Sequence, residues 1–279
     1  MKHADSPLMP SRLVTAAYHL PRYLGLARSL LIYWRPGRQR GLQRLYAEFV
    51  GPDDLVFDIG AHLGDRTAAF QALGARVIAL EPQPALFPWL KRLVGRRRGV
   101  TLLPCAAGAT PGTAELAVSE ATPTVSTLAH EWRRDIGERN AGFRKVRWQG
   151  RQRVSVTTLD TLIADHGLPR FCKIDVEGFE AEVLAGLTQP IAGVSVEFVA
   201  GALDVAERCV ARLKELGSYQ FNVIAGEQRR FTWAAWRSPA ATRDWLAAGA
   251  DGLASGDLYA RHIAHAIDHR HDTERTRHE

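Results

Sequence analysis

The chain has 279 residues, 46% of them hydrophobic, with 36 Lys and Arg against 30 Asp and Glu. This predicts one large α/β domain with an appendage. The whole excess positive charge of +6 falls in residues 1–50, which hold eight basic and two acidic residues, so the rest of the chain is formally neutral. A neutral body argues against a nucleic-acid channel through the domain. The cysteines, Cys105, Cys172 and Cys209, are odd in number and form no CxxC, which excludes a disulfide framework and predicts a reducing, cytoplasmic location.

Residues 1–50 are predicted to be a basic helical N-terminal extension. Its apolar stretch, 13–34, is interrupted by His19, Arg22 and Arg28, which excludes a secretory signal and a membrane-spanning helix. Amphipathic helices are expected instead, covering the domain or a partner copy, or making a peripheral contact with a membrane. An ordinary solvated helical face explains the charge equally.

The segment 55–82 is typical of a nucleoside-binding unit. Residues 55–59 are predicted to be a buried parallel strand, 67–73 a helix, and 77–80 the next strand. Glu81 follows at the carboxyl end of that strand, where a carboxylate can accept hydrogen bonds from both ribose hydroxyls.

The turn in this unit selects the cofactor. Its pattern is Asp58-x-Gly60-x-x-x-Gly64, and His62 occupies the position of the second glycine of a dinucleotide fingerprint. An imidazole there crowds a pyrophosphate, and Asp58 repels phosphate but suits a cationic ligand. The loop therefore favours S-adenosylmethionine over NAD, while a turn that merely shapes an α/β domain is the alternative.

The rest of the chain alternates strands and helices as doubly wound sheets do. The expected elements are a helix over 84–94, a strand over 100–105, one arm of a hairpin over 113–118, strands over 154–156 and 170–175, a helix over 176–187, a strand over 194–198, a helix over 205–216, a strand over 219–224, a helix over 245–248 and a final edge strand over 258–261. The sequence predicts an α/β domain over 51–265, with a mostly parallel sheet and helices on both faces. A disordered, charged tail over 266–279 is expected to follow.

The polar, arginine-rich segment 119–152 shows no clear periodicity, which indicates an inserted lid or binding loop. Its tryptophans and arginines either stack on and pair with an acidic sugar or belong to a plain solvated loop. These residues are Trp132, Trp148, Arg133, Arg134, Arg144 and Arg147. Within the same segment, His130 is expected to be a surface residue, with a place facing the acceptor as the alternative. Ser126 and Thr127 either touch a ligand or shape the loop.

The run 173–180, KIDVEGFE, places three carboxylates where a strand ends and a helix begins. Asp175 falls at the edge of the sheet where ligands bind. Glu177 and Glu180 have a simpler explanation, because helix N-termini favour negative charge.

Taken together, these motifs resemble the FkbM family of S-adenosylmethionine-dependent methyltransferases. The resemblance spans about residues 50–225 and rests on FDIGAHLGDRT (57–67), VIALEPQP (77–84), CAAGATPGTAEL (105–116), TVSTL (124–128), VTTLDTLI (156–163) and KIDVEGFEAEVLAG (173–186). It implies a class I methyltransferase (Rossmann-like) fold of seven mostly parallel strands with a reversed edge strand. It also implies O-methylation of a hydroxyl on a sugar, a glycan or a secondary metabolite. Many relatives carry Asn at the position of His62.

Site roles follow from the motifs and the resemblance together. Asp58, Gly60 and Gly64 are assigned to the methionine end of S-adenosylmethionine, Glu81 to the ribose, and Ala106 and Ala107 to the adenine. The full set expected at the cofactor is Asp58, Gly60, Ala61, His62, Gly64, Thr67, Glu81, Pro82, Ala106 and Ala107.

On the acceptor side, Asp175 is the first choice and Glu177 the second, as a base, orienting group or metal ligand. Glu197 could join Asp175 at a metal, but with no His or Cys to complete the set no metal site is predicted. The expected partner is a small-molecule or glycan acceptor, with no nucleic acid. An RNA methyltransferase and a cofactor-binding protein without activity are the alternatives.

Overall fold

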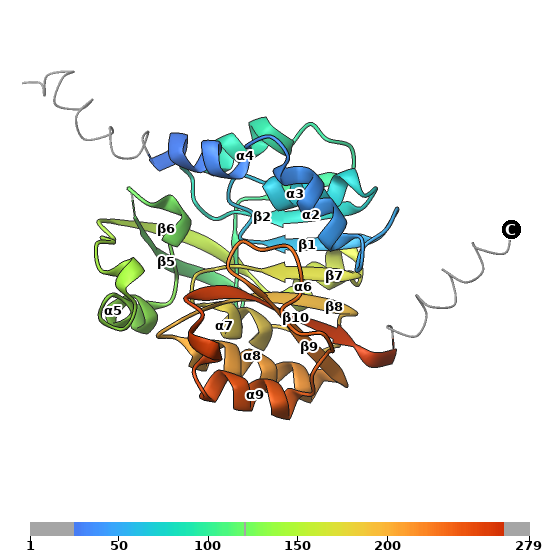
Figure 1. Ribbon diagram of the computed structural model, residues 1–279. Coiled ribbons are helices and arrows are strands. Elements are labelled where there is room, and N and C mark those ends of the chain that lie inside the picture. The colour runs from blue at the N-terminus through green and yellow to red at the C-terminus, as the bar shows by residue number, and fades with distance from the viewer. Residues whose placement is uncertain (1–24, 120, 265–279) are drawn as a thin grey trace, which may run out of the picture.

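A computed structural model describes residues 25–119 and 121–264, and it is organised around a seven-stranded sheet (Figure 1). The strand order is β3-β2-β1-β7-β8-β10-β9, and every strand is parallel to its neighbours except β10, which runs antiparallel to β8 and β9. The strands are β1 (Leu55–Ile59), β2 (Arg76–Leu80), β3 (Val100–Leu103), β7 (Phe171–Ile174), β8 (Gly193–Val199), β9 (Tyr219–Ala225) and β10 (Ser255–His262). This is the predicted fold class.

Helices cover both faces because side chains alternate along each buried strand. In β1, Leu55, Phe57 and Ile59 enter one core, while Val56 enters the other. The first core is closed by α6 (Leu159–His166), α7 (Glu180–Ala185), α8 (Leu203–Leu216) and α9 (Pro239–Ala247). The second is closed by α2 (Arg38–Tyr46), α3 (Asp65–Ala72) and α4 (Phe87–Val94).

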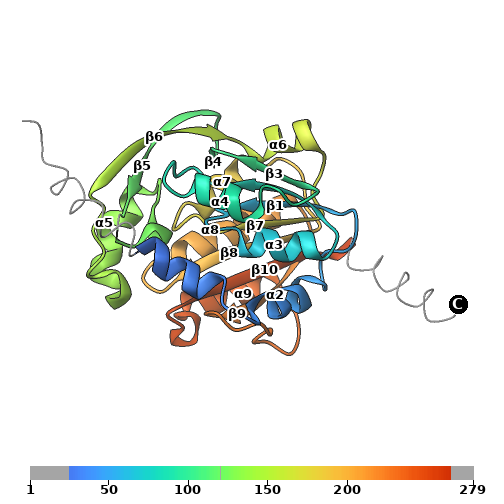
Figure 2. The ribbon, with the colours of Figure 1, turned by 90° about the horizontal axis from the view of Figure 1, so that it is seen from above.

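A second, three-stranded sheet of order β4-β6-β5 lies beyond the carboxyl ends of the parallel strands (Figures 1 and 2). Its strands are β4 (Ala106–Ala107), β5 (Gly112–Val118) and β6 (Gly150–Thr157). Strand β5 does not pair with the residues before the turn at 110–112 as a hairpin would; it pairs antiparallel with β6, across the long segment that follows it. The segment between them is not structureless, since it contains η1 (Pro123–Val125), α5 (His130–Arg139) and η2 (Ala141–Phe143). Helix α5 buries only Trp132 and Ile136, which is too sparse a pattern to show a helical period.

Strand β10 corrects one expectation. It is reversed, as implied, but it lies between β8 and β9 instead of at the edge, and β9 is the edge strand. Leu258, Tyr259 and Ala260 are successive and all buried, which is typical of a strand covered on both faces.

The N-terminal segment packs on the domain where it is described. Residues 25–33 are helical, and in α2 the side chains of Leu42, Leu45 and Tyr46 belong to the second core. The rings of Tyr46 and Phe70 are 4.3 Å apart. A division at residue 50 stays a prediction, and both the first 24 residues and the tail expected over 266–279 lie outside the described residues.

No helix in the described ranges is both long and apolar enough to cross a membrane.

Candidate active site

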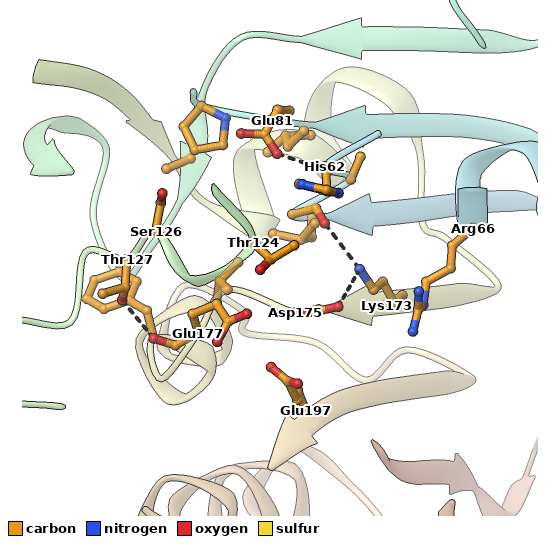
Figure 3. Close-up of a pocket in the computed structure, with 18 of the residues that line it drawn as sticks. His62, Arg66, Glu81, Thr124, Ser126, Thr127, Lys173, Asp175, Glu177 and Glu197 are labelled. Atoms are coloured by element: carbon orange, nitrogen blue, oxygen red, sulfur yellow. Dashed lines mark hydrogen bonds and ion pairs between the residues drawn. The ribbon is translucent and has the colours of Figure 1, made fainter. Parts of the chain in front are cut away.

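A cleft opens where β1, β2, β7 and β8 end, and its empty volume of about 1140 Å³ includes space open to solvent. The strand ends form one wall, and the segment between β5 and β6 forms the other (Figure 3). Of the expected site residues, those lining it are Gly60, Ala61, His62, Glu81, Pro82, Ala106, Ala107, Asp175 and Glu177. Asp58, Gly64 and Thr67 do not.

The three exceptions are packed beneath the cleft. Asp58 is fully buried, and its carboxylate accepts a hydrogen bond of 2.5 Å from Thr67 Oγ1. Its other oxygen lies 3.5 Å from Lys173 Nζ. A Cβ on Gly64 would lie 2.7 Å from Leu90 Cδ1, so this glycine serves the packing of α3 against α4. These residues support the loop from below, and their direct contact with the cofactor stays a prediction.

Gly60 is required by a close approach of two chain segments. Its φ is +80°, and a Cβ there would lie 1.9 Å from the carbonyl oxygen of Asp175. The loop after β1 and the end of β7 therefore touch through backbone alone. This contact brings the predicted cofactor loop and the predicted acceptor residue together.

Glu81 faces the cleft at the end of β2. Its carboxylate accepts backbone hydrogen bonds from His62 N at 2.9 Å and from Gln83 N at 2.8 Å. Burial raises the pKa of Glu81 to about 7, against the lowering effect of those two bonds. Each carboxylate oxygen has a second lone pair, which a ribose hydroxyl can use.

His62, expected at the cofactor, is packed into the wall of the cleft. It lines the cleft, adopts a φ of +50°, and packs edge-on to Tyr33 with ring centroids 5.2 Å apart. Its Nε2 is buried with no hydrogen-bond partner among the described residues. Burial lowers the pKa of His62 to about 4, so the ring is neutral at physiological pH.

Lys173 is the charged centre beneath the cleft. Its Nζ lies 3.1 Å from Asp175 Oδ2, and it donates to the carbonyl of Gly60 at 3.2 Å. Burial alone would raise the pKa of Asp175, but the Lys173 ammonium and the Arg66 guanidinium hold that pKa below its usual value. Asp175 is thus fixed as an anion pointing into the cleft.

Glu177 lies in a turn before α7 and not in the first turn of the helix as predicted. Its φ is +57°, and that of Gly178 is +90°. Glu180 Oε1 accepts hydrogen bonds from the backbone nitrogens of Val176 and Gly178 and so holds the turn. The helix-terminus explanation was therefore wrong for Glu177.

Asp175, Glu177 and Glu197 form an acidic cluster, with one oxygen from each lying within 4.8 Å of the others. Figure 3 shows all three side chains directed toward the same part of the cleft. Burial and the neighbouring carboxylates raise the pKa values of Glu177 and Glu197 well above their ordinary range. The negative charges of these carboxylates are therefore not fully balanced by neighbouring positive charges.

The inserted segment is tied to the cleft by polar contacts. Ser126 Oγ lies 3.0 Å from Gln83 Oε1, and Gln83 Nε2 donates to the carbonyl of Pro123 at 3.1 Å. Thr127 Oγ1 donates to the carbonyl of Glu177 at 2.7 Å. The segment thus joins the residues that follow β2 to the turn that carries Glu177.

The tryptophans of this segment are packing residues. Trp132 is buried, and a Cβ on Gly178 would meet its ring at 2.4 Å. Trp148 Nε1 donates to the carbonyl of Val125 at 2.7 Å. Neither ring lines the cleft, so these rings do not stack on an acidic sugar there, which was one of the two alternatives.

Several residues that line the cleft were not predicted from the sequence. They are Tyr33, Arg66, Gln83, Lys173 and Asp257. Lys173 stood inside a recognised motif, and its place two residues before Asp175 on one strand puts both side chains on the same face, which was a usable signal. Tyr33 and Asp257 come from distant segments, and no local pattern marks them.

Comparisons with known proteins give a family match and a curated relative. The model of the Methyltransferase FkbM domain matches residues 58–251. The hexuronic acid methyltransferase AglP from Haloferax volcanii is 30% identical over 185 residues, which are 64% of this chain and 70% of that protein.

Two solved structures are similar at low identity. A TehB-like SAM-dependent methyltransferase from Corynebacterium glutamicum has 12% identity and a TM-score of 0.46, over 88% of this chain and 99% of its own. A precorrin-6y C5,15-methyltransferase from Geobacter metallireducens has 13% identity and a TM-score of 0.43, over 79% and 87%. The family match covers most of the chain, and the protein belongs to the FkbM family of S-adenosylmethionine-dependent methyltransferases.

Proposed function

We propose that this protein binds S-adenosylmethionine in the cleft and methylates an oxygen of a sugar-containing acceptor, of which a hexuronic acid is the first candidate. The observation that carries this is that Glu81 and the acidic cluster line one cleft, joined by the contact between Gly60 and Asp175. A nucleoside site and a polar acceptor site are thereby adjacent. The similarity to a hexuronic acid methyltransferase supports the acceptor class.

The residues present fit the cofactor. Glu81 offers a buried carboxylate to the ribose, and Ala106 and Ala107 offer a small apolar surface to the adenine. His62 and the backbone from Gly60 to Ala61 face the methionine end. When bound, S-adenosylmethionine supplies an electrophilic methyl group on a sulfonium and is left as a neutral thioether.

On the acceptor side, this chain must orient a hydroxyl and receive its proton. Asp175 is held as an anion by Lys173, which makes it a weak base but a firm hydrogen-bond acceptor. The raised pKa of Glu177 makes its carboxylate a better place for the proton. Asp175 therefore orients the acceptor, and the proton passes to a free oxygen of the cluster.

Labelled methyl transfer tests the proposal. The enzyme is incubated with methyl-labelled S-adenosylmethionine and, in parallel, with a glucuronate-bearing oligosaccharide, its neutral glucose counterpart and total RNA. We expect label in the glucuronate-bearing acceptor, in a bond that survives mild base, because ethers resist base and methyl esters do not. Label in RNA alone would overturn the sugar assignment, and label lost in mild base would move the reaction from a hydroxyl to a carboxyl.

The pKa of Glu81 gives a pH dependence of nucleoside binding. Ribose hydroxyls donate to the ionised form, so with a pKa of about 7 the affinity for S-adenosylhomocysteine rises with pH. We expect a gain of about tenfold between about pH 6 and about pH 8. Glu81→Gln should bind more weakly at all pH values and lose this slope. Calorimetric titration measures both, and a wild-type affinity that is flat across this window would place the ribose elsewhere.

A further inference from the structure

We propose that Asp175, Glu177 and Glu197 bind one divalent cation of the Mg²⁺, Mn²⁺ or Ca²⁺ type. The three side chains come from the end of β7, the turn that follows it, and β8, so the fold brings them together from separate segments. Their role in catalysis rests on the proposed function, but the binding of a cation does not.

The spacing of the oxygens suits such an ion. Opposite ligands of a Ca²⁺ ion are about 5 Å apart, and those of Mg²⁺ about 4 Å. One oxygen from each carboxylate lies within 4.8 Å of the other two, so small side-chain adjustments complete a shared site. Hard cations prefer oxygen-only ligand sets, and the lack of His or Cys does not count against them.

An unpartnered oxygen points to the ligand independently of the spacing. Glu197 Oε2 is buried and has no hydrogen-bond partner among the described residues. A buried carboxylate oxygen without a partner is costly, and a cation would satisfy it. Figure 3 shows this carboxylate on the side of the cleft facing Asp175 and Glu177.

The neighbouring basic residues do not supply that partner. Lys173 Nζ is already shared by Asp175, Asp58 and the Gly60 carbonyl. Arg66 forms an ion pair with Asp65, with Nη1 and Oδ2 3.5 Å apart. In the part of the chain that the structure describes, neither Glu177 nor Glu197 forms an ion pair. A divalent cation would leave the three carboxylates with a net charge of −1.

The position of this site gives the cation a task in the proposed reaction. Three protein ligands leave open coordination positions for an acceptor hydroxyl and water. A hydroxyl bound there becomes more acidic, and its proton can leave through a carboxylate oxygen not bound to the ion. As the bond from the acceptor oxygen to the methyl carbon forms, the bond from that carbon to sulfur breaks. The ion would also attract the carboxylate of a hexuronic acid, which the bare cluster would repel.

Binding of Mn²⁺, read from the loss of its free electron paramagnetic resonance signal, tests the site without cofactor or acceptor. After treatment with a chelator and its removal, we expect wild-type protein to bind one Mn²⁺ per chain in competition with Mg²⁺. Glu197→Gln, which keeps the shape and removes the charge, should weaken binding by about tenfold or more. Glu177→Gln should act in the same direction.

Glu182→Gln is the matched control, because Glu182 is an exposed carboxylate of α7 that pairs with Arg208 outside the cluster. It should bind Mn²⁺ like the wild type. Wild-type protein that binds no Mn²⁺, or Glu197→Gln binding as tightly as Glu182→Gln, would overturn the proposal. Either result would leave the binding of S-adenosylhomocysteine unaffected, so failure of the metal site and failure of the proposed function are distinguishable. Thermal melting of each variant checks that it is folded.

Discussion

Replacing Asp175 with Asn is expected to lower turnover by about 10²- to 10⁴-fold while leaving the affinity for S-adenosylhomocysteine nearly unchanged. Asn keeps the shape of the side chain but removes the negative charge that faces the acceptor. Lys173 retains its contacts with Asp58 and the Gly60 carbonyl, so the loop after β1 keeps its support. Steady-state methyl transfer gives the turnover number, and calorimetry gives the dissociation constant.

Asp160→Asn is the control for this variant. Asp160 accepts a hydrogen bond from Thr188 N at 2.9 Å and lies away from the cleft. The Asp160→Asn variant should retain wild-type turnover. If Asp175→Asn lost nucleoside binding and turnover in equal measure, Asp175 would be a structural partner of Lys173 and not a residue of the acceptor site.

Replacing Gly60 with Ala is expected to destabilise the protein and weaken nucleoside binding together. The left-handed backbone costs a residue with a Cβ roughly 1–2 kcal/mol. The approach to the Asp175 carbonyl, 1.9 Å from the added atom, forces the loop and the end of β7 apart. We expect the free energy of unfolding to fall by about 2–5 kcal/mol in total, with a clear drop in melting temperature.

Gly37→Ala is the control that separates the cost of the left-handed backbone from the cost of the close approach to Asp175. The φ of Gly37 is +82°, close to the +80° of Gly60, but a Cβ there would meet nothing within 4 Å. Gly37→Ala should therefore lower the free energy of unfolding only by the cost of the backbone conformation, and it should retain nucleoside affinity. Equal loss of stability in the two variants, or a Gly60→Ala protein that melts like the wild type, would show that the contact between the two loops is not tight.

Most of the fold could be predicted because its signals are local. The buried run of β1, the glycine turn and the carboxylate after β2 each follow from a few neighbouring residues. The position of β10 could not, because a short strand buried on both faces carries no mark of its neighbours in the sheet. Helix α5 was missed because its mostly polar sequence buries two residues only, and tertiary packing of Trp132 gives it stability.

The residues of the site also differ in whether local sequence signals could predict their positions. Glu81 and Asp175 line the cleft, as their places at strand ends predicted. Asp58, which was assigned to the ligand, is fully buried beneath the loop. The meeting of Glu177 and Glu197 needed the backbone of the turn, whose positive φ no helical pattern predicts. No metal site was predicted because no His or Cys completes the set, although hard cations do not need such ligands.

A crystal structure of the protein with S-adenosylhomocysteine tests the central claim most directly. We expect the ribose hydroxyls on Glu81, the adenine beside Ala106 and Ala107, and the sulfur directed toward Asp175, Glu177 and Glu197. A nucleoside bound in the cleft with its ribose away from Glu81, or its sulfur directed away from the three carboxylates, would contradict it.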